Sequence, residues 1–461
     1  MDEKKCPVRA GDSVTLTVTD LGVHGEGIGK YEGFTIFVPG ALPGETARAK
    51  ISLVKRTYAV GNLSEIQEIS SARVVPRCPV YEECGGCQIS HLSYDAQLAV
   101  KRKRVADVLA RIGGYPAAVV HPVIGAADPV SYRNKMAVPA GFSKGRPALG
   151  YYRRGSHDII PTDFCEILRD GNNRLLAFAK DFMARHHISP YDEKTGTGSL
   201  RHILGRTGDG GRLMAVIVTA TETLPCEKEW ISELSEALPE CVSIYHNVQP
   251  GRGNVILGKK IRRLWGEETL TATLCGLTFS VSPFSFFQIN PEQAEILYET
   301  ALTYANLTGC ETVIDAYCGT GTITLALARR ACRAIGIEIV APAIEDAKKN
   351  AARNGITNAE FYAEDAARLM PRLAEEGMRP DVIVMDPVRA GCDEAVLKAA
   401  AAMSPARIVY VSCNPATFAR DAARLRDLGY TLREVTPVDM FPQTMHVEVV
   451  GIFEKGNGNE I

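Results

Sequence analysis

The stretch Thr312-Val-Ile-Asp-Ala-Tyr-Cys-Gly-Thr-Gly321 decides the fold of the C-terminal part of the chain. Its β-branched, apolar start predicts a buried parallel strand, and its two glycines predict a tight turn before a helix over residues 322–330. A glycine turn of this kind lets the backbone approach a bound cofactor closely. From about residue 276 onward strands and helices alternate in the same way, which is typical of a mostly parallel sheet.

Acidic residues stand at the ends of the next three predicted strands: Glu338, Glu364-Asp365 and Asp386. Glu338 can accept hydrogen bonds from both hydroxyls of a ribose, and Asp365 can meet the amino group of an adenine. A pyrophosphate would instead require amides and cations. In addition, Thr324 stands where the dinucleotide fingerprint has its third glycine. The pattern therefore favours S-adenosylmethionine, and a dehydrogenase is the weaker interpretation.

A cysteine ends a further strand in Tyr410-Val-Ser-Cys-Asn-Pro415. The strand over residues 407–412 is β-branched and aromatic, and Asn-Pro stops it because proline has no amide proton to pair. In open α/β sheets ligands bind at the carboxyl ends of the strands, which is where Cys413 would lie. A lone cysteine is more often a small buried hydrophobe, and we assign Cys318 and Cys392 to packing. The neighbouring motifs favour a covalent nucleophile for Cys413.

The composition excludes several broad classes of protein. The 461 residues are 46% hydrophobic and 23% charged, which predicts two to four ordinary globular domains. The net charge of -2 confines any nucleic-acid surface to a local patch. Residues 1–5 lead into no secretory signal, and no apolar run reaches the length of a bilayer span. We therefore expect a cytoplasmic protein that binds no membrane, whose 13 cysteines are thiols or metal ligands.

Residues 6–70 have the pattern of a small all-β domain. Alternating apolar and polar residues predict a strand at 13–19, and glycines at 22, 25, 27 and 29 mark the turn that follows it. Further short strands are predicted around residues 34–38, 45–51 and 58–63. Strands of this size and number suggest a five-stranded, OB-like barrel.

Three cysteines, Cys78, Cys84 and Cys87, lie within ten residues of one another. Thiolates this close can converge on one metal, and a closed zinc or iron–sulfur site requires four ligands. The fourth candidate is Cys165, although His91 is nearer in the sequence. A structural zinc site remains the alternative to an iron–sulfur cluster.

A helix is predicted over residues 92–112, closed by Gly113-Gly114, and it could pack against either neighbouring domain. Its run Lys101-Arg-Lys-Arg104 is either a solvated face or a phosphate contact. The following region, 125–275, is rich in short strands. Basic residues stand beside aromatic or amide groups at residues 132–135, 151–154 and 201–206, a combination that favours an RNA-facing surface.

Five motifs occur in the order Phe286-Phe-Gln-Ile-Asn-Pro291, Asp315-Ala-Tyr-Cys-Gly, Asp386-Pro-Val-Arg, Ser412-Cys-Asn-Pro and His446-Val-Glu448. This set resembles the RNA uracil-C5 methyltransferases of the TrmA/RumA family. The segment GEGIGKYEGFTIFVPGALPGE resembles the RNA-binding TRAM module found on RNA-modifying enzymes. The spacing of the four cysteines is similar to that of the family's [4Fe-4S] ligands. The resemblance spans nearly the whole chain, with Thr322 and Val388 as departures from the usual residues.

The resemblance implies three domains: a TRAM OB-like barrel (6–70), a β-rich central RNA-binding domain with the iron–sulfur cluster (71–275) and a Rossmann-like class I methyltransferase domain with a mostly parallel seven-stranded sheet (276–458). It implies S-adenosylmethionine contacts at Gln288, Tyr317, Glu338 and Asp386, to which the pattern of the residues adds Gly319, Gly321 and Asp365. The implied cluster ligands are Cys78, Cys84, Cys87 and Cys165.

The implied reaction follows from the chemistry of uracil. C5 is a weak nucleophile, so a thiolate, Cys413, first attacks C6, and a base then removes the C5 proton. We predict Glu448 as this base. His446 is the alternative because alternation along a strand would put both side chains on one face.

The expected partner is RNA, with 23S rRNA as the first candidate and tRNA as the alternative, and we expect a monomer. Two other classes stay open. One is a cytosine-C5 RNA methyltransferase, in which Pro-Cys is the usual motif. The other is a non-catalytic RNA-binding protein.

Overall fold

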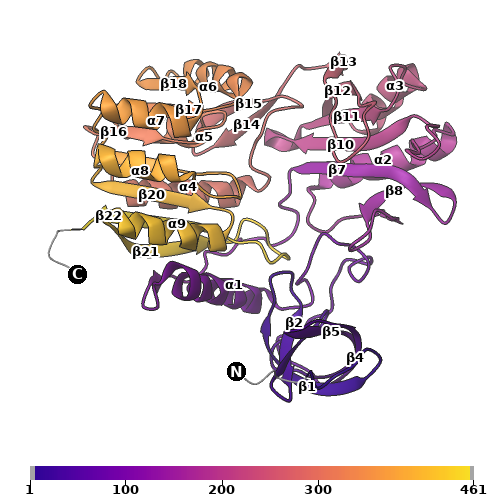
Figure 1. The fold of residues 1–461 in the computed structure, drawn as a ribbon. Helices are drawn as coiled ribbons and strands as arrows, with labels where there is room; N and C mark the ends of the chain where they lie inside the picture. Colours follow the sequence, from indigo (N-terminus) through magenta and orange to yellow (C-terminus); the bar gives the residue numbers. More distant parts are fainter. Residues whose placement is uncertain (1–5, 457–461) are drawn as a thin grey trace.

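The computed structural model describes residues 6–456, and Figure 1 shows a barrel, a central sheet and a C-terminal sheet in chain order. The expectation about a secretory signal falls on residues 1–5, which lie outside the described residues, as do positions 457 and 458 of the predicted C-terminal domain. Among the described residues no helix combines the length and the apolar character needed to cross a membrane.

The N-terminal strands form a closed five-stranded barrel in the order β1-β2-β3-β5-β4, which confirms the prediction. The strands are β1 (Ser13–Leu21), β2 (Gly27–Tyr31), β3 (Phe34–Val38), β4 (Thr46–Val54) and β5 (Tyr58–Glu68). One detail of the prediction is wrong, because Gly27 and Gly29 lie in β2 and not in the preceding turn. A Cβ on Gly29 would stand 2.5 Å from the carbonyl oxygen of Thr17, so the strands can approach only because this position is glycine.

The central region is built on a seven-stranded sheet in the order β13-β12-β11-β10-β7-β8-β9. Its strands are β7 (Lys135–Ser143), β8 (Arg146–Tyr152), β9 (Ile159–Pro161), β10 (Leu200–Thr207), β11 (Leu213–Thr219), β12 (Cys241–Val248) and β13 (Lys260–Gly266). Helices α2 (Asp170–Arg185) and α3 (Glu227–Ala237) share one core with this sheet, where the rings of Phe182 and Trp230 stack with their centroids 3.9 Å apart. Other sheet residues, such as Met214, belong to the core of the C-terminal region.

The C-terminal region contains an eight-stranded sheet in the order β18-β17-β16-β19-β20-β22-β21-β6. Its strands are β16 (Thr312–Asp315), β17 (Arg333–Glu338), β18 (Ala359–Ala363), β19 (Val382–Met385), β20 (Arg407–Ser412), β21 (Tyr430–Val438), β22 (Glu448–Lys455) and β6 (Val119–Val120). Strands β16 to β20 are parallel, which confirms the predicted character of the sheet. The predicted count of seven omits β6, which comes from the preceding region and pairs with the edge strand β21.

Helices pack on this sheet (Figure 1). A hairpin of β14 (Leu270–Leu274) and β15 (Leu277–Val281) comes before β16 in the chain. The helices are α4 (Pro291–Ala305), α5 (Thr322–Ala328), α6 (Ala341–Arg353), α7 (Ala366–Glu375), α8 (Glu394–Met403) and α9 (Pro415–Asp427). Buried apolar side chains from these helices and strands form two large cores.

The helix after the cysteine segment, α1 (Tyr94–Val108), packs against the C-terminal region. A π-helical turn (η1, Leu109–Gly113) continues it, and Gly114 ends it with a φ of 70°. Val105 and Leu109 are fully buried in the same core as Phe418 of α9. The sequence left open which neighbouring domain this helix packs against. Its buried apolar face shows that it packs against the C-terminal region.

The basic run on α1 is a solvated face only at Arg102 and Lys103, which are exposed, and all four of its residues contact other parts of the protein. Lys101 is 0% exposed, and its Nζ lies 2.5 Å from the buried carboxylate of Asp439. Arg104 donates to the carbonyl of Met445 at 2.7 Å. Lys103 pairs with Asp20 of the barrel at 2.6 Å, and Arg102 donates to a backbone carbonyl of β6. The run thus ties α1 to the barrel, to β6 and to the loop that precedes Glu448.

Candidate active site

Cys413 lies at the carboxyl end of β20, between that strand and α9. The antiparallel pairing of Ser412 with Val449 makes Cys413 and Glu448 the next residues of β20 and β22, so the two meet at the edge of the sheet. Asn414 caps α9 by accepting from the amide of Ala416 at 3.2 Å, and its Nδ2 donates to the carbonyl of Arg389 at 3.3 Å. These contacts hold the thiol beside the loop after β19.

Burial raises the pKa of the Cys413 thiol to about 11, and the carboxylates of Glu448 and Asp386 add to this effect. The nearby guanidinium of Arg389 opposes it. The thiol is therefore protonated at neutral pH in the free protein. It can act as a nucleophile only when a cation or a base assists its ionisation.

Glu448 is only 8% exposed, and burial followed by the charge of Asp386 raises its pKa to about 8. Burial and the charge of Asp315 raise the pKa of Asp386 to about 7. The pKa of Asp315 itself is raised to about 6, mainly by burial. Within residues 6–456 these three acids form no ion pair, so a cation bound at this end of the strands would favour their ionised forms.

His446 lies beside the site, but not as the sequence pattern suggested. Strand β22 begins at Glu448, so His446 precedes it and the alternation along a strand does not apply. Burial, together with Arg389 and Arg104, lowers the pKa of His446, so its ring is neutral at physiological pH. His446 lines the same cavity as Cys413.

The predicted glycine turn joins β16 to α5 beside Glu338. The amide of Gly319 donates to one oxygen of Glu338 at 3.2 Å, and the amide of Val340 donates to the other at 2.8 Å. Gly319 and Gly321 have φ values of 54° and 84°, which favour glycine. The carboxylate of Glu338 is thus fixed against the turn, where a ribose could reach it.

Thr324 explains the departure from the dinucleotide fingerprint. Its hydroxyl donates to the buried carboxylate of Asp315 at 2.6 Å, a contact that a glycine could not make. Asp315 therefore keeps a partner inside the core while it remains at the end of β16. The sequence pattern identified the missing glycine but not this role.

The side-chain amide of Gln288 is 3.5 Å from the hydroxyl of Tyr298 on α4. The hydroxyls of Tyr298 and Thr322 are 3.1 Å apart. Burial, and then the charge of Asp386, raise the pKa of Tyr298. Tyr298 was not predicted, and its one signal in the sequence is its helical spacing after Asn290, whose side chain caps α4 by accepting from the amide of Gln293. Thr322, the departure from the family pattern, therefore faces this group.

Tyr317 and Asp365 complete the predicted cofactor residues. The charge of Asp365 acts on Tyr317, which lies against the buried Cys392. One oxygen of Asp365 accepts from the amide of Ala367 at 2.9 Å and so caps α7. The structure thus brings the predicted residues together along the carboxyl edge of β16 to β20.

Four cysteines and Cys413 line one cavity of 680 Å³. The four are Cys78, Cys84, Cys87 and Cys165, and all 13 cysteines, each among the described residues, are free thiols. His91 is not a lining residue, and its ring is hydrogen-bonded to Tyr81, which is one. In residues 6–456, however, no three or more His, Cys, Asp or Glu side chains are arranged to hold a metal ion.

Backbone amides point at several of these sulfurs. The amide of Gly86 donates to Cys84 Sγ at 3.3 Å. Burial raises the pKa of the Cys78 and Cys165 thiols, and backbone hydrogen bonds from Val80 to Cys78, and from Ile167 and Leu168 to Cys165, oppose this effect. Amide donors around converging thiols are a feature of metal–thiolate sites.

The basic clusters of the central region differ in exposure. Arg133 lines the Cys413 cavity and is available to a ligand. Arg206 is 5% exposed and donates to the carbonyl of Ser285 at 2.6 Å, and Arg201 is 6% exposed and pairs with Glu193. The predicted cluster at residues 201–206 is therefore part of the fold, and not an open RNA surface.

Comparisons with known proteins agree with this arrangement. Residues 261–456 match the family described as tRNA (Uracil-5-)-methyltransferase, and residues 7–63 match the TRAM domain. The chain is 47% identical to an RNA methyltransferase of Halalkalibacterium halodurans over 99% of this chain and 100% of that protein. It is 46% identical to an RNA methyltransferase of Oceanobacillus iheyensis over 98% of each chain.

Among solved structures the chain is similar to the tRNA (uracil-54, C5)-methyltransferase of Pyrococcus abyssi in complex with S-adenosyl-L-homocysteine. The TM-score is 0.77 with 28% identity, and the similarity covers 95% of this chain and 99% of that one. The barrel, the mostly parallel sheet and these full-length relatives lead to one conclusion. The chain belongs to the TRAM-containing, S-adenosylmethionine-dependent uracil-5 RNA methyltransferases of the TrmA/RumA type.

Proposed function

We propose that the protein methylates C5 of a uridine in RNA through a covalent bond between Cys413 and C6 of the base. The observation that carries this proposal is the adjacency of the Cys413 thiol and the buried Glu448 carboxylate at the ends of β20 and β22. The positive charge of Arg389 lowers the pKa of both groups, against the effect of burial. Arg133 lines the same cavity as Cys413. This is the pairing of nucleophile and base that methylation at C5 requires.

The residues divide the reaction between them. The Cys413 thiol gives up its proton to solvent, Sγ adds to C6, and the electron pair of the C5–C6 double bond makes C5 nucleophilic. When bound, S-adenosylmethionine would supply an electrophilic methyl group on a positive sulfonium, whose sulfur would keep the electron pair of the broken S–C bond. Glu448 takes the proton from C5 after methyl transfer, the double bond re-forms, and the Cys413 thiolate leaves. The target base must leave its stack to reach Cys413.

The cofactor residues suit this role. Burial raises the pKa of Asp315, Asp386 and Glu448, the charge of Asp315 raises that of Asp386 further, and the charge of Asp386 that of Glu448, so a sulfonium cation beside them would favour their ionised forms. Glu338 is positioned to accept from ribose hydroxyls, and Asp365 from an adenine amino group. Gln288, Tyr317 and the two glycines of the turn are the remaining contacts that we propose for the cofactor.

The ionisation of Glu448 gives a test by pH. With RNA and S-adenosylmethionine both well below saturation, kcat/KM is expected to rise with pH in two steps. The first has its midpoint near 8, where Glu448 ionises, and the second lies at higher pH, where the Cys413 thiol ionises. Saturating S-adenosylmethionine should lower the first midpoint, since the sulfonium favours the carboxylate. His446→Gln should leave this midpoint in place. A first midpoint below 6 would assign the ionisation to another group.

The RNA substrate has two candidates. The barrel combined with the cysteine cluster supports 23S rRNA. The similarity to a tRNA enzyme over 95% of this chain, which includes residues of the barrel, supports tRNA as the second candidate. Incubating the protein with each unmodified RNA and radiolabelled S-adenosylmethionine, followed by mass spectrometry of the nucleosides, distinguishes them. Label in 5-methylcytidine, or none in either RNA, would contradict the proposed function.

We also propose that Cys78, Cys84, Cys87 and Cys165 hold a [4Fe-4S] cluster. The support is their shared cavity and the backbone amides around Cys78, Cys84 and Cys165. The thiols must move closer together than they stand in the structure, since no metal-holding arrangement is found among residues 6–456. Such a cluster would join the segment after the barrel to the central sheet and shape the RNA-facing wall of the cavity.

Anaerobically purified protein is therefore expected to be brown and to contain about four iron atoms per chain. Cys165→Ser should remove most of the iron and weaken RNA binding, while affinity for S-adenosylmethionine changes little. Cys226→Ser, a half-buried cysteine elsewhere in the central region, is the control. One zinc per chain without visible absorbance would favour the structural-zinc alternative.

A further inference from the structure

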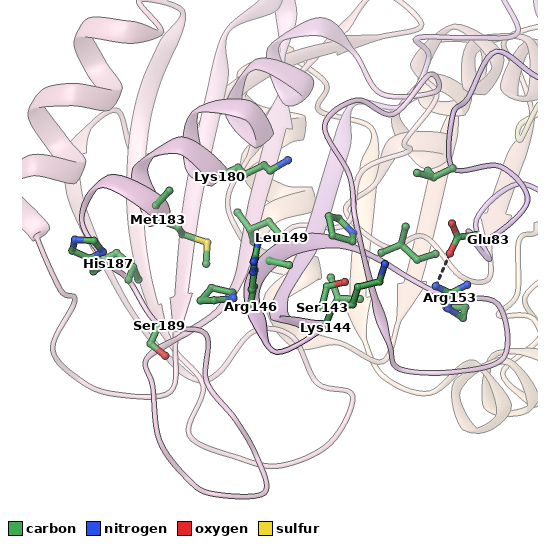
Figure 2. A pocket seen from close by; sticks show the side chains of 18 residues that line it. Glu83, Ser143, Lys144, Arg146, Leu149, Arg153, Lys180, Met183, His187 and Ser189 are labelled. Carbon is green, nitrogen blue, oxygen red and sulfur yellow. Dashed lines mark ion pairs between the residues drawn. The ribbon is translucent and has the colours of Figure 1, made fainter.

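A second cavity, of 1130 Å³, lies in the central region (Figure 2). Its walls come from the β7–β8 hairpin, from β9 and from the end of α2 with the loop that follows. Leu149, Met183 and Ile188 line it, and each is at most 5% exposed because it belongs to the core of the central sheet. The floor of the cavity is therefore apolar and fixed by core packing.

The rim of this cavity is basic. The side chains of Lys144, Arg146, Arg153, Lys180 and His187 line it, and Glu83 is the one acid among the lining residues (Figure 2). Arg153 pairs with Glu83, and Lys180 pairs with Asp163 outside the cavity. Among the interactions of residues 6–456, neither Lys144 nor Arg146 has an ion-pair partner. Lys144 and Arg146 of the hairpin therefore carry positive charge that no neighbouring acid neutralises.

These two cations are carried by the β7–β8 hairpin. Ser143 pairs with Arg146 across a two-residue turn, in which Lys144 and Gly145 have φ values of 49° and 76°. The turn is tight, so the backbone that carries both exposed cations is held at the rim of the cavity. Two cations beside an apolar floor match a nucleotide, whose phosphates are charged and whose base is flat and apolar on its faces.

The cavity is next to the proposed reaction site. Val80 lines this cavity and also the cavity that contains Cys413, so the segment around residue 80 is the wall between them. We propose that the second cavity binds one unstacked base of the substrate RNA, on the same molecule as the target uridine, with its flanking phosphates on Lys144 and Arg146. The inference rests on the proposed methylation of RNA, and it adds a site that selects the RNA.

Lys144→Ala/Arg146→Ala tests the phosphate contacts. KM for the substrate RNA is expected to rise about tenfold or more, and the slope of log affinity against log salt concentration to fall by about 1.4, at roughly 0.7 for each single-strand contact. kcat at saturating RNA and affinity for S-adenosylmethionine should stay unchanged. Lys228→Ala/Arg263→Ala removes the same charge from exposed positions on α3 and β13 and is the matched control.

Ala184→Trp tests the base pocket, because Ala184 is an exposed lining residue and a larger side chain fills the cavity without a change of charge. It should also raise KM for RNA. With 4-thiouridine in the RNA, crosslinks are expected at residues 143–149 or 183–189.

Wild-type KM and salt slope in the hairpin variant would overturn the proposal, and so would crosslinks confined to other segments. An effect of the hairpin variant without any effect of Ala184→Trp would overturn the base pocket. Failure of the wild-type protein to methylate RNA would instead overturn the proposed function.

Discussion

Cys413→Ala is expected to abolish methyl transfer to RNA, with a loss of about 10³-fold or more, because no other group can activate C5 in its place. Affinity for S-adenosylmethionine should survive, since the predicted cofactor residues lie on β16 to β19, α4 and their loops. Filter assays of methyl transfer and calorimetry of cofactor binding measure the two effects separately.

A trapping experiment makes the same prediction sharper. RNA with 5-fluorouridine at the target position has no C5 proton to lose, so the wild-type protein should stay covalently attached after denaturation. Cys413→Ala should form no such adduct, and Cys310→Ala, which removes an exposed cysteine, should form it normally. Near-normal turnover by Cys413→Ala would refute the covalent mechanism.

Glu448→Gln is expected to lower turnover about 10²- to 10⁴-fold, by the loss of a general base, and to accumulate a protein–RNA adduct on unmodified RNA. The variant also removes the neighbouring charge that helps to raise the pKa of Cys413. Attack on C6 should therefore be at least as easy as in the wild-type protein, while release of the thiol fails. Denaturing gels and mass spectrometry of the methylated adduct measure this outcome.

Glu454→Gln is the matched control, because Glu454 lies on the same strand but is only half-buried and pairs with Arg433. It should leave turnover and adduct level unchanged. If Glu448→Gln blocks methyl transfer and no adduct is found, the base is another residue. His446 would then be tested first, since it lines the cavity with Cys413.

Local sequence determined much of this protein. The alternation in residues 13–19 and the β-branched run before Gly319 specify their strands, because a strand that buries one or both faces needs those residue types. The order of the strand-end residues Glu338, Asp386 and Cys413 also follows from the sequence. In a parallel sheet all such residues arrive at one edge.

Tertiary structure alone decided the remaining features. Lys101 looks like a surface charge in the sequence, yet it is buried, because its partner Asp439 lies 338 residues further along the chain. The fit of Gly29 against Thr17 and the bond from Thr324 to Asp315 likewise depend on atoms that only folding brings together. The pKa values of Cys413 and Glu448 depend on burial and on mutual charge, and both are properties of the assembled site.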